Sequence, residues 1–129
     1  MIVLDASAAV ELLAESRVGL RVEQFLRADH ALAPEVLDVE VASALARLVR
    51  AGTLTDEVGT SRIRSLQRLP VQRIPHRPLA TRAWQLRDRV RISDAFYVAC
   101  AELVGASLVT TDARLGRAAL RGVTVTVVS

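Results

Sequence analysis

The stretch DAFYVACAELVGASLVTTDARL, residues 94–115, decides the fold of this chain. Asp94 opens an apolar helical segment and Gly105 closes it, because glycine readily adopts the left-handed backbone at the end of a helix. The run ASLVTT at 106–111 then has the composition of a buried strand, and it leads to the carboxylate of Asp112. A strand that follows a helix and carries an acid at its tip is typical of a parallel α/β sheet with functional residues at the strand ends.

The rest of the chain alternates between strand-like and helix-like segments in the same way. The predicted strands cover residues 2–4, 30–34, 71–75, 106–111 and 123–128. The predicted helices cover residues 6–13, 18–26, 35–51, 55–69, 79–90, 94–104 and 115–120. This alternation predicts a parallel α/β sandwich, in which right-handed crossovers place the carboxyl ends of all strands on one rim.

Length and composition favour one domain that spans residues 1–129, because a chain of 129 residues with 51% hydrophobic content can fill one core. Asp5 and Glu11 interrupt the N-terminal apolar segment where a signal peptide needs an unbroken one. Cys100 is the only cysteine, so no internal disulfide can form. We therefore expect a soluble cytoplasmic protein without a membrane segment.

The formal net charge of +3 hides an uneven distribution. Residues 1–60 carry 10 acids and 5 arginines, whereas residues 61–129 carry 4 acids and 12 arginines. Each guanidinium group can bind two phosphate oxygens, so the basic half fits a nucleic-acid backbone. A solvated basic surface explains the same composition, and both interpretations remain open here.

Four acids are candidates for a shared site. Asp5 follows the first strand and Asp112 follows the fourth, so both project from the rim where parallel strands end. Asp94 opens the helix that leads into the fourth strand. Glu40 lies in the long helix, about 60° from the centre of the apolar stripe, and is half turned toward the core. We expect these four acids to converge.

Each acid also has a structural explanation. Aspartate is a favoured N-cap, and Asp5, Asp94 and Asp112 each precede a predicted helix. A cap uses only one carboxylate oxygen, so capping does not exclude a second role. Glu40 has the alternative of an ion pair with Arg47 or another arginine.

Carboxylates that cluster repel each other unless a cation neutralises them. Oxygen ligands without His or Cys select Mg²⁺ or Mn²⁺ rather than zinc, and His30 and His76 are far from the acids in sequence. A divalent ion in such a site can activate water and stabilise a phosphodiester during cleavage. The four acids therefore indicate nuclease chemistry.

Several motifs resemble the PIN-domain ribonucleases, and most closely the VapC toxins of type II toxin-antitoxin pairs. They are IVLDASAAVELL, the Glu in APEVLDVEVASALARLVRAG, and SDAFYVACAELVGASLVTTD with its trailing ARL. The resemblance covers nearly the whole chain and implies a three-layer α/β/α PIN-like sandwich with a mainly parallel sheet of four to five strands. It also implies Mg²⁺-dependent endonucleolytic cleavage of RNA by a metal-activated water, with Mn²⁺ as a substitute.

Carried over by position, the resemblance makes Asp5, Glu40, Asp94 and Asp112 catalytic, with Asp5, Asp94 and Asp112 as metal ligands. Ser7 and Thr111 match small polar positions that support the acids through hydrogen bonds.

The implied partners are an RNA substrate and a VapB-like antitoxin, with a homodimer or a hetero-oligomer with antitoxin as the expected assembly. Arg91 and Arg114 are candidates for RNA backbone contacts because they lie close to Asp94 and Asp112 in sequence. Many relatives have an aromatic residue or a Thr-Tyr pair where this chain has Ile92 and Ser93, so substrate preference transfers less readily.

Other classes of protein also carry acids on such a rim. A receiver domain needs a paired acid after the first strand and a lysine near the last strand, and this chain contains no lysine. A haloacid-dehalogenase-like phosphatase needs Asp-x-Asp after the first strand, and Ser7 occupies the second position. The remaining alternative is a catalytically inactive PIN-like module that binds RNA or protein.

Overall fold

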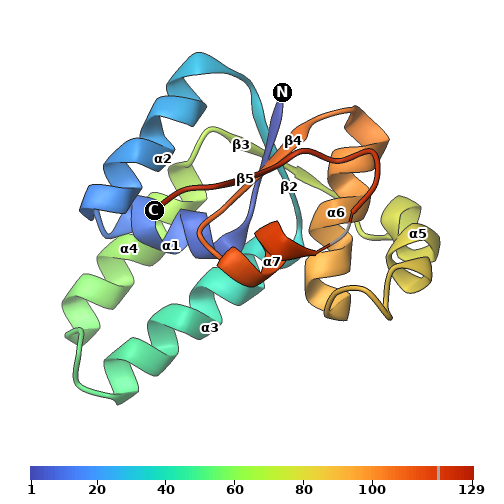
Figure 1. Cartoon of the computed structure of the whole chain (residues 1–129). Coiled ribbons are helices and arrows are strands. Elements are labelled where there is room, and N and C mark those ends of the chain that lie inside the picture. The colour runs from blue at the N-terminus through green and yellow to red at the C-terminus, as the bar shows by residue number, and fades with distance from the viewer. Residues whose placement is uncertain (119) are drawn as a thin grey trace.

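The computed structural model describes residues 1–118 and 120–129, and Figure 1 shows how its strands and helices are arranged. The strands are β1 (Ile2–Leu4), β2 (Ala31–Pro34), β3 (Val71–Ile74), β4 (Ser107–Thr110) and β5 (Val125–Val127). The helices are α1 (Ala6–Leu13), α2 (Arg17–Ala28), α3 (Val36–Arg50), α4 (Asp56–Arg68), α5 (Ala80–Gln85), α6 (Ile92–Val104) and α7 (Ala113–Arg117), with a 3₁₀ turn at Arg77–Leu79 before α5.

The five strands form one sheet in the order β3-β2-β1-β4-β5. Every neighbouring pair is parallel, so all carboxyl ends share one rim, as the sequence predicts. The chain starts in the centre of this sheet, because β1 pairs with β2 on one side and with β4 on the other. Residues from the two ends of the chain therefore meet at the rim.

Helices cover both faces of the sheet, which makes the three layers that the resemblance implies (Figure 1). Helix α6 packs across β1, β2 and β4, and α5 packs against α6. On the other face α1 packs against β4, α2 and α3. Because it is covered on both sides, β1 is buried along its whole length.

Several helix boundaries differ from the sequence prediction. The helix predicted over 79–90 ends at Gln85, and turns follow up to Val90. Leu86 and Val90 still share one side because the Val90 amide donates to the Leu86 carbonyl, which explains why their spacing resembled a longer helix. Helix α6 begins at Ile92, so Asp94 lies in the first turn rather than at the N-cap.

The last helix, predicted over residues 115–120, lies earlier in the chain, because α7 begins at Ala113 and ends at Arg117. Residue 119, which the prediction included, lies outside the described residues. Among the described residues, no helix combines the length and apolar character needed to cross a membrane.

Candidate active site

Asp5 stands at the carboxyl end of β1 and is almost fully buried, with 5% of its surface exposed. Its backbone amide donates to the Val109 carbonyl at 2.9 Å, which places Asp5 beside the end of β4. Burial raises the pKa of this carboxyl, and the charge of Asp94 adds to the effect. Hydrogen bonds from Ser7 and Thr110 oppose the rise in pKa.

Two hydroxyl groups hold the Asp5 carboxylate in place. Ser7 Oγ donates to Asp5 Oδ2 at 2.5 Å, and Thr110 Oγ1 donates to the same oxygen at 2.7 Å. Thr111 contributes its backbone amide, which donates to Ser7 Oγ at 3.1 Å. The Asp112 amide donates to Thr110 Oγ1 at 3.0 Å. These bonds join the start of α1 to the corner between β4 and α7.

Thr110 is therefore the hydroxyl partner that sequence reasoning missed when it selected Thr111. The register pairs Leu4 with Val109, so the residue after Val109 lies beside the residue after Leu4. Neighbouring residues of a strand point to opposite faces, and only one of the two threonines can point at Asp5. The register of β1 with β4 was the missing information.

Glu40 reaches the same region from α3, and Tyr97 approaches it from α6. Burial raises the pKa of Glu40, the charges of Asp5 and Asp94 raise it further, and Tyr97 and Arg91 lower it. Glu40 Oε1 and the Tyr97 hydroxyl are both buried, and within the described residues neither makes a hydrogen bond of regular geometry. Three carboxylates from separate elements thus influence one another electrostatically.

The structural alternatives explain only part of this arrangement. Among the described residues Glu40 has no ion pair with Arg47 or another arginine. Asp5 occupies the N-cap position of α1 but makes no side-chain cap hydrogen bond. Asp112 does cap a helix, because its side chain accepts from the Arg114 amide at 2.9 Å.

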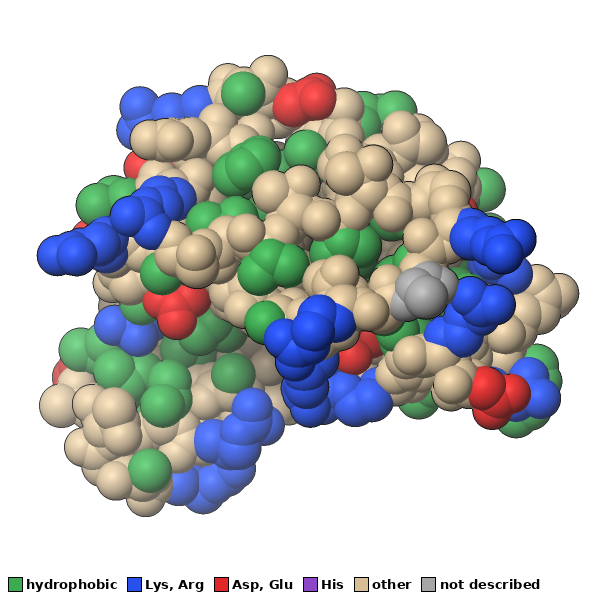
Figure 2. All heavy atoms as spheres, viewed as in Figure 1, with side chains coloured by type: hydrophobic (Ala, Val, Ile, Leu, Met, Phe, Trp, Pro, Cys, Tyr) green, Lys and Arg blue, Asp and Glu red, His purple; other side chains and the backbone are tan. Residues whose placement is uncertain are grey.

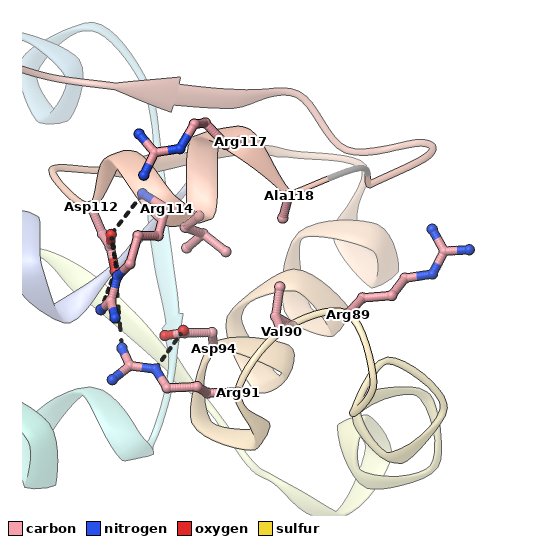
Figure 3. Close-up of a pocket in the computed structure, with 9 residues that line it drawn as sticks. Arg89, Val90, Arg91, Asp94, Asp112, Arg114, Arg117 and Ala118 are labelled. Atoms are coloured by element: carbon pink, nitrogen blue, oxygen red, sulfur yellow. Dashed lines mark hydrogen bonds and ion pairs between the residues drawn. The ribbon is translucent and has the colours of Figure 1, made fainter.

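Two arginines contact Asp94 and Asp112, which are the outer acids of the site, as Figure 3 shows. Arg91 Nε lies 3.1 Å from Asp94 Oδ2, and Arg91 Nη2 lies 3.9 Å from Asp112 Oδ2. Arg114 Nη2 lies 3.1 Å from Asp112 Oδ2 and its Nε lies 3.3 Å from Oδ1. Arg114 lowers the pKa of Asp112 by hydrogen bonding to the charged form.

A groove of about 390 Å³ opens beside these acids. Its lining contains Arg89, Val90, Arg91, Asp94, Asp112, Arg114, Leu115, Arg117 and Ala118. Figure 2 shows arginine side chains around a carboxylate in the region where Figure 1 places α7. Acidic side chains therefore lie at one end of a groove with basic walls.

The donor chemistry of the site fits a hard divalent cation. Asp5, Glu40 and Asp94 offer only oxygen atoms, and Glu40 Oε1 is buried without a hydrogen-bond partner in the described part of the chain. Within residues 1–118 and 120–129, however, no three His, Cys, Asp or Glu side chains are already arranged to hold a metal ion. The guanidinium of Arg91 contacts Asp94 and lies within 3.9 Å of Asp112, so it occupies part of the space near these two carboxylates.

The model of the PIN domain family matches residues 2–120. The chain belongs to this family, and the acids just described occupy the strand-end rim of its sheet.

Within the family the chain belongs with the VapC ribonucleases. It is 42% identical over 117 residues to Ribonuclease VapC12 of Mycobacterium tuberculosis, a match that covers 91% of each chain. It is also 42% identical over 120 residues to Ribonuclease VapC3 of the same organism, covering 91% of this chain and 86% of the relative.

Solved structures share the fold at low sequence identity. VapBC2 from Rickettsia felis, bound to a DNA fragment from its promoter, matches with a TM-score of 0.73 at 14% identity and full coverage of both chains. VapC20 of M. tuberculosis, a sarcin-ricin loop cleaving toxin, matches with a TM-score of 0.68 at 15% identity, covering 96% of this chain and 99% of that one. The expected PIN-like α/β/α sandwich is thereby confirmed.

Proposed function

We propose that this protein is a divalent-metal-dependent endoribonuclease and the toxin of a type II toxin-antitoxin pair. One structural observation carries the proposal: Asp5, Glu40 and Asp94 come from three separate elements, and burial together with the neighbouring carboxylates raises the pKa of Asp5 and of Glu40. Carboxylates that repel each other in a buried place have a strong affinity for a cation. The names of the 42% identical relatives support ribonuclease activity.

Asp5, Asp94 and Asp112 are the proposed ligands of Mg²⁺, with Mn²⁺ as a substitute, and Glu40 completes the negative charge. A bound divalent ion supplies Lewis-acid stabilisation of phosphate charge and lowers the pKa of water. Ser7 and Thr110 fix the Asp5 carboxylate by holding Oδ2. Glu40 is the residue proposed to orient a nucleophilic water or accept its proton, and burial raises its pKa above the usual value of a glutamate.

An antitoxin of the VapB class is the proposed protein partner. The solved complexes with this fold include VapBC2 of R. felis and a toxin-antitoxin complex from Klebsiella pneumoniae, which matches with a TM-score of 0.71 at 17% identity over 96% of both chains. Leu20 of α2 is 56% exposed and Val39 of α3 is 64% exposed, which offers apolar surface to a partner. A homodimer, or a hetero-oligomer with antitoxin, remains the expected assembly.

The test is cleavage of a mixed RNA pool by the purified protein in Mg²⁺, in Mn²⁺ and in EDTA. Asp94→Asn removes one proposed ligand, and Asp88→Asn is the matched control because Asp88 is exposed and lies outside the groove. We expect wild type and D88N to cleave only with metal and D94N to be at least about 100-fold slower. Calorimetry with Mn²⁺ measures metal binding by the same three proteins.

The outcomes separate the nuclease from the inactive module. Cleavage that persists in EDTA, or that D94N retains, contradicts the metal-dependent mechanism. Metal binding without cleavage of the RNA pool or of cellular RNA favours the alternative of a PIN-like binding module.

A further inference from the structure

The outer acids of the site are paired with arginines from their own chain. Arg91 contacts Asp94 and approaches Asp112, and Arg114 contacts Asp112 through two guanidinium nitrogens. Asp94 and Asp112 belong to different elements, α6 and the cap of α7, so Arg91 links the two sides of the groove. The negative charge that attracts a metal ion is thus partly neutralised within the chain.

These ion pairs are weak because their guanidinium groups are mostly exposed to solvent. The side chain of Arg91 is 63% exposed and that of Arg114 is 67% exposed, whereas those of Asp94 and Asp112 are only 13% and 20% exposed. Exposed ion pairs contribute little stability because water competes for both partners. The carboxylates are therefore fixed near the site, while the guanidinium groups can move into solvent at small cost.

The groove has a basic lining in which these guanidinium groups could instead contact the phosphates of a bound strand. Arg117 lines the same groove and is exposed, and within the described residues no hydrogen bond or ion pair of its side chain is found. The apolar part of the described lining consists of Val90, Leu115 and Ala118, and none of the described lining residues is an aromatic side chain on which a base could stack. Such a lining suits the phosphate backbone of a strand rather than its bases.

We propose that Arg91 and Arg114 are exchangeable counterions of the site. Without metal they neutralise Asp94 and Asp112; when a divalent cation occupies these carboxylates, both guanidinium groups are released into the groove and bind RNA phosphates beside Arg117. The inference rests on the proposed function, because it needs the same carboxylates to bind metal. The exchange makes metal binding and RNA binding mutually favourable. Metal frees the guanidinium groups from the carboxylates, and RNA phosphates keep the guanidinium groups away from the metal ligands.

Calorimetric titration with Mn²⁺ alone, in the absence of RNA, tests the exchange. Arg91→Gln removes the competing cation, and Arg117→Gln is the matched control because it removes the same charge from the same groove without breaking a carboxylate contact. We expect R91Q to bind Mn²⁺ about fivefold more tightly than wild type, the worth of an exposed ion pair. We expect less than a twofold change in R117Q.

A second measurement follows the released guanidinium groups. Fluorescence anisotropy reports binding of a labelled single-stranded RNA, with and without Ca²⁺, and a gel verifies that the RNA stays intact. Ca²⁺ is expected to raise the RNA affinity of wild type and R117Q by a larger factor than that of R91Q. Arg91→Met repeats both measurements with a side chain that cannot donate a hydrogen bond to a carboxylate, and circular dichroism verifies the fold of each variant.

The results distinguish this inference from the proposed function. If R91Q and R91M bind Mn²⁺ no more tightly than R117Q does, the counterion exchange is wrong, while metal-dependent cleavage can still hold. If the gain from Ca²⁺ is the same in wild type and R91Q, the guanidinium groups are not released toward RNA. If wild type binds no Mn²⁺ at all, the proposed function itself fails.

Discussion

At the scale of single residues, the buried carboxylate of Asp5 lowers the stability of the fold. Asp5 is buried at the end of a buried strand, and hydrogen bonds from the hydroxyl groups of Ser7 and Thr110 and from the Ala6 backbone partly compensate its charge. Burying a carboxylate is unfavourable unless hydrogen bonds and opposite charges offset the loss of hydration. The raised pKa of Asp5 indicates that its hydrogen bonds offset this loss only in part.

Asp5→Asn should therefore stabilise the fold in metal-free buffer at pH 7. The amide keeps an oxygen acceptor for Ser7 and Thr110 and removes the desolvated charge, so we expect a gain of about 1 kcal/mol, or roughly 3–5 °C in Tm. The native state holds the Asp5 proton more tightly than the unfolded chain does. Lowering the pH through the Asp5 pKa thus restores wild-type stability, and the difference between the proteins should shrink in acid.

Thermal unfolding in EDTA at pH 7 and in mild acid measures this effect. Asp29→Asn is a control with the opposite sign, because the N-terminal amine lowers the pKa of Asp29 and removing that charge cannot stabilise the fold. An Asp5→Asn protein that is less stable than wild type at pH 7 would show that Asp5 is mainly a structural hydrogen-bond acceptor.

Tyr97→Phe tests the contact between α6 and Glu40. The hydroxyl lowers the pKa of Glu40, so its loss should raise that pKa and move the acidic limb of the activity profile to higher pH. We expect kcat/KM on the acidic limb to fall about five- to tenfold, with a smaller loss at the alkaline end of the profile, because a raised pKa matters most where Glu40 is partly protonated. Stability should change by less than about 1 kcal/mol, since the hydroxyl makes no regular hydrogen bond.

The pH profile of RNA cleavage, measured from pH 5 to 9, decides between a positioning and a packing role. A uniform loss of activity at all pH values would mean that Tyr97 supports the core and leaves the ionisation of Glu40 unchanged.

At the scale of elements, a single glycine lets two helices meet. A Cβ added to Gly19 in α2 would lie 2.0 Å from the carbonyl oxygen of Glu11 in α1, so the backbones themselves are in contact. A side chain at this position cannot be accommodated by a change of rotamer. Gly59 in α4 differs, because its added Cβ would meet only the Val49 Cγ2 atom, at 2.9 Å.

Gly19→Ala should consequently destabilise the protein by roughly 2–3 kcal/mol, although alanine favours a helix more than glycine does. Gly59→Ala is the control, with the same gain in helix propensity and only a flexible side chain to displace, and it should stay within about 1 kcal/mol of wild type. Urea unfolding of both variants checks the comparison. Equal stabilities would mean that α1 and α2 can separate without cost.

At the scale of the whole molecule, the central part of α6 is buried in the core. Cys100 of this helix is fully buried, and burial raises its pKa to about 11. Alkylation requires the thiolate, which is scarce at pH 8 for a thiol whose pKa lies above its usual range. Modification of Cys100 must then wait for opening of the fold.

Iodoacetamide at pH 8 should therefore modify the folded protein at least about 1,000-fold more slowly than the protein in guanidinium chloride. Ser61→Cys places a second thiol on the exposed side of α4 and should add one rapidly modified group, as mass spectrometry can count. Rapid modification of wild type would indicate that α6 opens locally, far below the free energy of global unfolding.

The sequence alone determined the layered α/β fold and the acids that stand at the strand ends. Asp5 and Asp112 each follow a run of apolar residues, and periodicity reveals strands and helices because burial repeats within one short segment. The resemblance of its motifs to the PIN-domain ribonucleases also pointed to the family, which the match of the family model over residues 2–120 confirms. The end of α5 was not predicted, because Leu86 and Val90 keep helical spacing across a turn.

Only the tertiary structure decided how these residues meet. Thr110 rather than Thr111 binds Asp5 because of the register between β1 and β4, which pairs residues more than one hundred positions apart. The approach of Tyr97 to Glu40 and the link of Arg91 to Asp94 and Asp112 likewise depend on packing between separate elements. Local periodicity carries no information on strand order, register or rotamer, because these are fixed by contacts between distant parts of the chain.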